Sequence, residues 1–164
     1  MTIELTRAVS ATLLGLILSA TGRAHGGSVG DVSITHPYAT PSVPGAGNGA
    51  AYIADLENTG KQADRLVRVS TPVAGRTEMH TMTIDADGVM RMREVTELPL
   101  APGAEIKMRP GAGMHFMLIG LKRPLQEGDT FPMSLEFERG GLAVVKVVVQ
   151  VPKTREGEMP EHRH

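Results

Sequence analysis

The sequence contains no cysteine and no tryptophan, and aromatic residues make up only 3% of its 164 residues. Without cysteine there is no disulfide, no thiolate metal ligand and no cysteine nucleophile. A blue-copper electron-transfer site is excluded as well, because it needs a thiolate. The formal net charge is −1 at pH 7, and no concentrated basic patch indicates a nucleic-acid partner. The core must therefore be built from Val, Leu, Ile, Ala and Met.

The first 24 residues have the pattern of an export signal peptide. Arg7 gives a positive start, and the apolar run over residues 9–20 is too short to span a bilayer. Cleavage after Ala24 fits the small-x-small rule and would leave His25 at the mature N-terminus, while cleavage after Ala20 stays open. Because no cysteine follows the run, we expect no lipid anchor. We expect an exported, soluble, periplasmic protein that is not membrane-embedded.

After residue 24 the sequence alternates short β-type segments with turns rich in Gly, Pro, Asn and Asp, and no long helix is expected. The candidate strands are Val32–Ala39, Ala50–Leu56, Arg65–Val73, Thr77–Ile84, Val89–Val95, Ile106–Met108, Met114–Ile119, Phe131–Phe137 and Leu142–Val151. This spacing predicts an all-β domain, either an antiparallel sandwich or a barrel of about eight or nine strands. We expect a signal peptide at 1–24, one β-domain at 25–152, and a charged, flexible tail at 153–164.

Histidine and methionine alternate on three of the short segments. The pairs are His80 and Met82, Met90 and Met92, and His115 and Met117. Side chains on a strand change face at every residue, so the two members of each pair share a face. Imidazole and thioether are soft, neutral ligands that suit Cu(I). The pattern therefore predicts a copper site built from these pairs.

Strand register decides whether Met92 can join His80. A three-residue loop ending in a left-handed Gly88 would pair Met82 with Met92 and Ile84 with Met90. A two-residue loop would move Met92 to the opposite face, because a slip of one residue flips every side chain. The sequence does not choose between these loops, and the copper hypothesis predicts the first.

Each of these residues also has a simpler interpretation. Methionines on strands are usually core residues, and we expect that role for Met108, Met133 and Met114. Core packing would explain Met90 and Met92 about as well as metal binding does. His36, which stands alone beside a proline, is expected to be structural.

Two further places could take metal. If His25 is the mature N-terminus, its amine and imidazole would chelate additional Cu(II). A tail with Met159, His162 and His164 would act as an auxiliary metal-capturing segment, although a solvated tail is the default expectation.

Taken together, the residues resemble the periplasmic copper chaperones of the PCuAC family. The resemblance covers about residues 32–151. It rests on Ala51-Tyr52, Asn58, Asp64-Arg65-Leu66, Glu78-Met79-His80, Gly88-Val89-Met90-Arg91-Met92-Arg93, Pro102-Gly103, Pro110-Gly111, His115-Phe116-Met117-Leu118, Leu121-Lys122 and Gly128-Asp129.

The resemblance implies a cupredoxin-like Greek-key β-sandwich that binds one Cu(I) per domain through two His and two Met. Carried over to this sequence, the ligands are His80, Met92, His115 and Met117. The family places about ten residues between the first His and its Met. Here nine residues separate His80 from Met90 and eleven separate it from Met92, so Met90 stays open as the alternative.

The resemblance also implies a partner that receives copper, either a cytochrome c oxidase subunit or its assembly factor. We expect a monomer that is not an enzyme. A copper resistance or storage protein would need the same ligands, and a metal-free interaction module would need none of them. An enzyme with an oxidative copper centre at His25 is a further alternative, and mass spectrometry showing a start at Thr21 would exclude it.

Overall fold

The computed structural model describes residues 26–111 and 113–152, and within these ranges the regular structure consists of eleven β-strands without a helix. They are β1 (Gly26–Val29), β2 (Val32–Ala39), β3 (Asn48–Asn58), β4 (Asp64–Ser70), β5 (Ala74–Ile84), β6 (Met90–Val95), β7 (Leu98–Leu100), β8 (Glu105–Ile106), β9 (Gly113–Leu121), β10 (Thr130–Phe137) and β11 (Gly141–Val149). The described part of the chain accordingly holds no helix long and apolar enough to cross a membrane.

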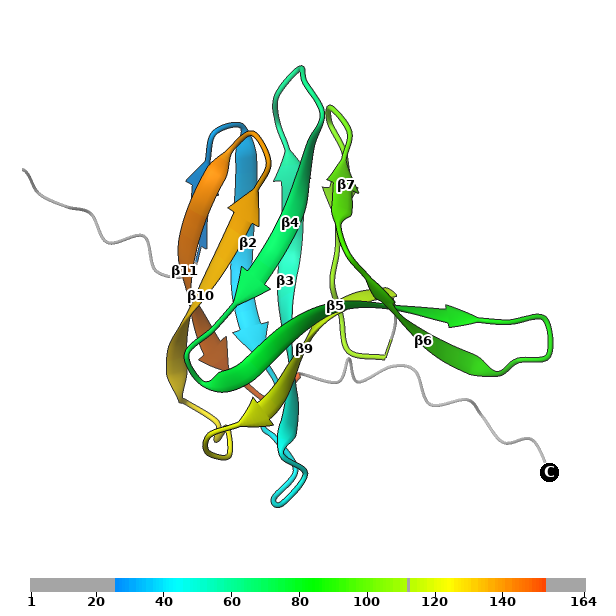
Figure 1. Ribbon diagram of the computed structural model, residues 1–164, viewed down its shortest axis with the longest axis vertical. Coiled ribbons are helices and arrows are strands. Elements are labelled where there is room, and N and C mark those ends of the chain that lie inside the picture. Colours follow the sequence, from blue (N-terminus) through cyan, green and yellow to red (C-terminus); the bar gives the residue numbers. More distant parts are fainter. Residues whose placement is uncertain (1–25, 112, 153–164) are drawn as a thin grey trace, which may run out of the picture.

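The strands form one continuous hydrogen-bonded path in the order β6-β5-β9-β3-β2-β11-β10-β4-β7, with β1 added beside β2 and β8 beside β3. The path curls over itself into a sandwich (Figure 1). All neighbours are antiparallel except β11 and β2, which run parallel. Strands β5 and β9, which carry His80 and His115, are therefore direct neighbours although more than twenty residues separate them along the chain.

One hydrophobic core fills the sandwich, with contributions from both ends of the strand path. Phe116 from β9, Ile53 from β3 and Phe137 from β10 are fully buried in it. On β10 and β11 buried and exposed positions alternate strictly, as expected for strands with one face on the core and one in water. Met108 and Met133 are fully buried, so their prediction as core residues is confirmed, and Met114 packs against the core from its edge.

The all-β prediction is confirmed. Eight of the nine expected segments coincide largely with a strand, and the ninth, Ile106–Met108, shares only Ile106 with β8. Two short strands were not expected. β1 is a Gly-Gly-Ser-Val segment without apolar alternation, and β7 is a three-residue strand with Pro99 at its centre. Neither composition favours a strand, and each pairs with a longer neighbour, β1 with β2 and β7 with β4. The expected signal peptide, His25 and the tail lie outside the described residues.

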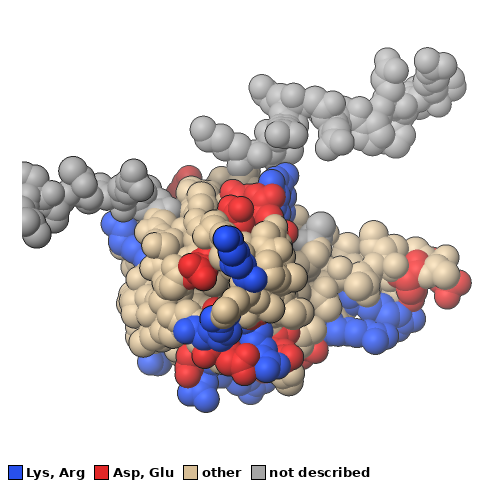
Figure 2. All heavy atoms as spheres, turned by 90° about the horizontal axis from the view of Figure 1, so that it is seen from above, with Lys and Arg blue, Asp and Glu red and all other residues tan. Residues whose placement is uncertain are grey.

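Strands β5 and β6 continue beyond the sandwich as a two-stranded hairpin, which projects from its side (Figure 1). We call this projecting part, residues 81–94, the arm. Within the described ranges β6 pairs with β5 alone, and no strand from these ranges pairs with its other edge. Basic side chains gather along one side of the arm and acidic ones at its end (Figure 2). Arg91 and Arg93 of β6 share one face, and the methionines of β6 share the other.

Candidate metal centre

The turn of the arm has the register that the copper hypothesis requires. The amide of Asp85 donates to the carbonyl of Val89 over 3.0 Å, and Gly88 has a φ of 76°, which is the left-handed conformation. Met82 therefore pairs with Met92, and Ile84 with Met90. The prediction of a three-residue loop is confirmed.

Side-chain hydrogen bonds explain why the chain turns here. The carboxylate of Asp85 accepts from the backbone amides of Asp87 at 3.1 Å and Val89 at 2.9 Å, and from Nε of Arg91 at 2.6 Å. An aspartate that bonds to the backbone two residues ahead stabilises a turn locally. The turn chemistry thus specifies the register, and through it the face on which Met92 lies.

Across the other edge of β5, His80 is the direct cross-strand partner of His115 on β9. Their ring centroids are 5.7 Å apart and the ring planes meet at 76°. Met117 pairs with Glu78, one same-face position along from His80 on β5. The register therefore brings both histidines and Met117 to one patch of the sheet.

The two methionines of the arm lie at different distances from this patch. On β6 the direct partner of His80 is Glu94, Met92 is one same-face position further out, and Met90 is two. Met92 is therefore the diagonal neighbour of His80, and Met90 is more remote. This placement favours Met92 over Met90 within the set, and the ligand assignment itself stays a prediction.

The four candidate ligands differ in exposure. His115 is only 5% exposed, His80 and Met117 are partly buried, and Met92 is 51% exposed. The patch therefore runs from the interior of the sheet on β9 to an open surface on the arm. A metal bound there would have one deep imidazole and one thioether in contact with solvent.

Glu78 orients His80. Its Oε2 lies 2.9 Å from Nε2 of His80, and its Oε1 accepts from Nε of Arg76 at 2.6 Å. A carboxylate accepts hydrogen bonds, so Nε2 carries the proton and Nδ1 is the free ring nitrogen. Nδ1 is buried and has no hydrogen-bond partner among the described residues. The hydrogen bond from His80, followed by those from Arg76, holds the pKa of Glu78 below its usual value.

A buried imidazole nitrogen without a partner costs free energy unless something binds it. A histidine that donates one ring N–H to a carboxylate and leaves the other nitrogen free is the arrangement found in metal-binding histidines. Burial, and next the neighbouring His80, lowers the pKa of His115, so the neutral imidazole that binds metals is favoured there. The two rings fit a metal site.

The remaining donors decide which metal fits. Among the described residues no three side chains of the His, Cys, Asp or Glu types gather as a possible metal site. A site at His80 and His115 therefore depends on thioethers for its other ligands. Thioethers bind Cu(I) well and the harder divalent ions poorly.

Two tyrosines lie beside this patch, and neither was predicted from the sequence as a neighbour of the site. The ring of Tyr52 on β3 lies 6.3 Å from that of His115, and Tyr38 on β2 stacks on Tyr52 at 5.2 Å. With His36 at 5.4 Å from Tyr38, a row of rings crosses β2, β3, β9 and β5. Alternation places Tyr52 on one face of its strand, but pairing between β3 and β9 could not be foreseen. The contact of Glu78 with His80 could have been predicted, since residues two apart on a strand share a face.

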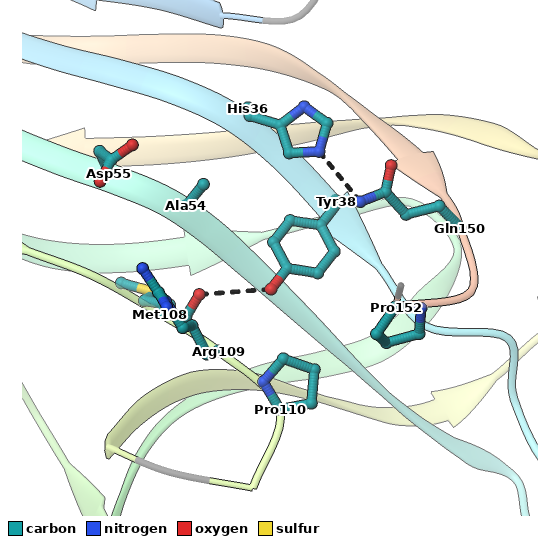
Figure 3. A pocket seen from close by; sticks show the side chains of 9 residues that line it. All are labelled: His36, Tyr38, Ala54, Asp55, Met108, Arg109, Pro110, Gln150 and Pro152. Atoms are coloured by element: carbon teal, nitrogen blue, oxygen red, sulfur yellow. Dashed lines mark hydrogen bonds between the residues drawn. The ribbon is translucent and has the colours of Figure 1, made fainter. Parts of the chain in front are cut away.

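The row ends at a hollow of about 340 Å³, where His36 lies beside Gln150 and the hydroxyl of Tyr38 donates to the carbonyl of Met108 (Figure 3). Nε2 of His36 is 2.9 Å from Nε2 of Gln150. His36 has a φ of 48°, a left-handed conformation that is uncommon outside glycine. Its hydrogen bond and its ring contact make His36 part of the wall, in line with the expected structural role.

Comparisons with known proteins show the family of the chain and proteins of similar fold. The family described as "Putative lipoprotein LpqE-like" matches residues 32–149. The "Putative lipoprotein Lxx21020" of Leifsonia xyli subsp. xyli (strain CTCB07) is 31% identical over 149 residues, which cover 87% of this chain and 86% of the relative.

Solved structures with a similar fold include copper proteins. The apo PCuAC domain from PmoF1 has a TM-score of 0.67 at 26% identity, covering 78% of this chain and 100% of that one. The copper-bound PCuAC domain from PmoF2 has a TM-score of 0.65 at 25% identity, covering 78% and 99%. The Cu(I) form of DR1885 from Deinococcus radiodurans has a TM-score of 0.58 at 26% identity, covering 80% and 85%.

Proposed function

We propose that this chain, which belongs to the LpqE-like family and resembles PCuAC copper-chaperone domains in fold and sequence, binds one Cu(I) and delivers it to a receiving protein. The resemblance to PCuAC domains and their cupredoxin-like all-β fold is confirmed by the solved structures. The copper-chaperone class follows from that similarity. The oxidation state, the stoichiometry, the ligands and the destination of the copper are our proposal.

The observation that carries the proposal is the pairing of His80 with His115. The two imidazoles face each other across adjacent strands, and the buried Nδ1 of His80 has no hydrogen-bond partner in the described part of the chain. A thioether flanks this pair on each side, Met117 on β9 and Met92 on β6. We propose these four residues as the ligands.

Copper is the cargo of this site, and the side chains determine how it is held. All four donors are neutral and two are thioethers, so the site favours the monovalent, softer ion. Glu78 fixes the ring of His80 through its hydrogen bond, and burial keeps His115 in its neutral form. Met92 is the exposed ligand, so exchange with a partner would begin there and proceed one ligand at a time.

We further propose that the protein acts in the periplasm and supplies copper for cytochrome c oxidase assembly, through a subunit of the oxidase or its assembly factor. The export pattern of residues 1–24 supports secretion. The names of the matched family and of the Leifsonia relative describe lipoproteins, a class of exported proteins. A copper resistance or storage role would use the same ligands.

The test is an anaerobic Cu(I) competition titration of the purified protein. It includes a version that ends before Met159, which removes the histidines of the tail. Both are expected to bind a first Cu(I) tightly, and the His115→Ala/Met117→Ala double variant is expected to lose that tight first step. A Met133→Leu variant, altered in the core, is the control. Tight binding of the first Cu(I) by the double variant would show that copper binds at other residues. If no form of the protein binds Cu(I), the alternative of a metal-free interaction module would be favoured.

A further inference from the structure

The arm carries more thioethers than the proposed site uses. Met82 and Met92 are direct cross-strand partners, and Met90 lies two residues from Met92 on the same face. Cross-strand partners have Cβ atoms about 4.5–5.5 Å apart, and diagonal neighbours remain within reach of long side chains. Three methionine side chains therefore share one small face of a two-stranded ribbon. We call this face, formed by Met82, Met90 and Met92, the thioether face.

Packing does not explain the thioether face. Met90 is 56% exposed and Met92 is 51% exposed, so neither is a core residue. The sheet path ends at β6, so no further strand of the described residues lies beside the arm. The alternative interpretation of Met90 and Met92 as core residues is therefore wrong. Large apolar side chains grouped on a protruding surface usually indicate a binding function.

The thioether face also opens toward the histidine pair. Across β5, the partner of Met82 on β9 is Gly113, which has no side chain and a φ of 65°. A Cβ atom built at Gly113 would meet no other atom within 4 Å. Space therefore remains beside Met82, next to His80 and His115.

The opposite face of the arm does not compete for a cation. Arg91 and Arg93 pair with Thr83 and Thr81 on that face, so their guanidinium groups lie on the side away from the methionines. Arg91 is additionally held by Asp85 through a contact of 2.6 Å. The thioether face itself offers neutral sulfur donors.

We propose that Met82, Met90 and Met92 form a second Cu(I) site on the arm, distinct from the His80/His115 site and sharing Met92 with it. Its ligand is a soft monovalent cation, since three thioethers bind Cu(I) and not the harder divalent ions. Cu(I) arriving from outside meets these exposed sulfurs first. It then passes to the histidine site while Met92 stays bound. The Cu–S bonds to Met82 and Met90 break as Cu–N bonds to His80 and His115 form, and a Cu–S bond to Met117 is added, without a change of oxidation state.

This inference rests on the proposed function, because the arm site exchanges copper with the histidine site. The two can be tested separately by following each methionine methyl group. Protein labelled with 13C at the methionine methyl groups is titrated with Ag(I), a redox-stable soft monovalent ion, and the methyl resonances are recorded by NMR. The tail Met159 is assigned through a Met159→Leu variant, so that binding there is recognised separately.

The first equivalent of Ag(I) is expected to shift the methyl signals of Met117 and Met92. With Met92 already on the first ion, the second equivalent is held by Met82 and Met90 and is expected to shift their signals, while the buried Met108 and Met133 stay unmoved. A Met82→Leu/Met90→Leu variant keeps the apolar surface and is expected to lose the second equivalent. It should also take up Cu(I) from a weak chelator about tenfold more slowly. Ile84→Leu changes the same face without removing sulfur and serves as the matched control.

The outcomes separate the two proposals. If the protein is saturated by one equivalent of Ag(I), and the methyl signal of Met117 shifts while those of Met82 and Met90 do not, the proposed arm site is wrong and the histidine site is supported. If the arm methyl groups shift and Met117 does not, the arm site stands and the histidine site is wrong. If none of the four methyl groups shifts, both are wrong. Uptake of Cu(I) at an unchanged rate in the leucine variant would overturn the role of the arm in exchange.

Discussion

The carboxylate of Glu78 lies 2.9 Å from Nε2 of His80 and is itself held by Arg76. Because β-strand side chains two residues apart share a face, this contact is built into strand β5. It fixes the proton on Nε2 and leaves Nδ1 of His80 as the nitrogen available to a metal. Through this contact, Glu78 is expected to affect how tightly the proposed site binds Cu(I).

Replacement of Glu78 by glutamine should weaken Cu(I) binding without abolishing it. The amide is a weaker acceptor, so the ring of His80 is held less firmly, and loss of such a supporting residue typically costs about 10–100-fold in metal affinity. Anaerobic Cu(I) competition measures the change. Glu94→Gln is the control, since Glu94 is the partner of His80 on β6 and loses the same charge. Equal effects of the two variants would show that charge alone matters.

Met92 and Met90 should respond differently to substitution. Met92→Leu is expected to weaken binding of the first Cu(I) by more than about tenfold, or about 1.4 kcal/mol, because a ligand next to His80 is lost. Met90→Leu is expected to leave that first step nearly unchanged, since Met90 is two same-face positions from His80 along β6. The same competition titration measures both variants. A larger loss from Met90→Leu would reassign the ligand.

Asn58 should be important for stability. It is 1% exposed, its Nδ2 donates to the carbonyls of Gln62 and Leu100 at 2.8 and 3.0 Å, and its Oδ1 accepts from the amide of Gly60 at 3.0 Å. Asn58→Ala leaves buried backbone groups unpaired, which is expected to lower the free energy of unfolding by about 1–3 kcal/mol.

Urea unfolding measures this loss as a lower midpoint. Asn48→Ala is the comparison, because Asn48 is exposed and accepts a single 3.3 Å hydrogen bond from Gly120. Its effect is expected to stay within about 0.5 kcal/mol. If the two variants unfold at the same urea concentration, the bonds of Asn58 do not stabilise the fold in this way.

Asp64 should make stability depend on acid pH. Burial alone would raise its pKa, but the backbone amides of Arg139, Arg65 and Gly140 donate to its carboxylate, and the net pKa lies below the usual value. Because the pKa of Asp64 is lower in the folded state, its carboxylate contributes its full stabilisation of the fold at pH values above the pKa of Asp64 in the unfolded chain. It is lost as the pH falls through the pKa of the folded state.

The corresponding experiment is urea unfolding of the protein and of Asp64→Asn over a series of pH values from neutral to strongly acidic. At neutral pH the variant should be less stable, because the charged acceptor of three amides is gone. The difference should shrink as the pH falls and Asp64 becomes protonated in the native protein. A difference that is constant with pH would contradict this assignment.

Much of the fold and part of the site follow from local patterns. Apolar alternation in β10 and the Val-rich run of β11 predict two strands, and the structure has them, each with one buried face. The sequence Asp85-Ala86-Asp87-Gly88 predicts a hairpin turn, since aspartate caps its own turn and glycine adopts the left-handed conformation at low cost. Alternation also shows that His80 shares a face with Met82 and with Glu78.

These local patterns could not predict which strands pair when they are far apart in the sequence. The sequence contains nothing that makes β9 the neighbour of β5 on one side and of β3 on the other, and so nothing that brings Tyr52 beside His115. The short strands β1 and β7 were missed for the same reason. Their hydrogen bonds are made with β2 and β4, and their own residues show no strand pattern.

The sequence by itself determined the soft, cysteine-free donor set, the all-β class and the faces within each strand, because residue chemistry and the two-residue period of a strand are local properties. Only the tertiary structure decided that His80 faces His115, that Met92 and not Met90 is the diagonal neighbour, and that the arm methionines are exposed. These depend on the register between strands, which is set by one turn for β5 and β6 and by the packing of the whole sandwich for β5 and β9.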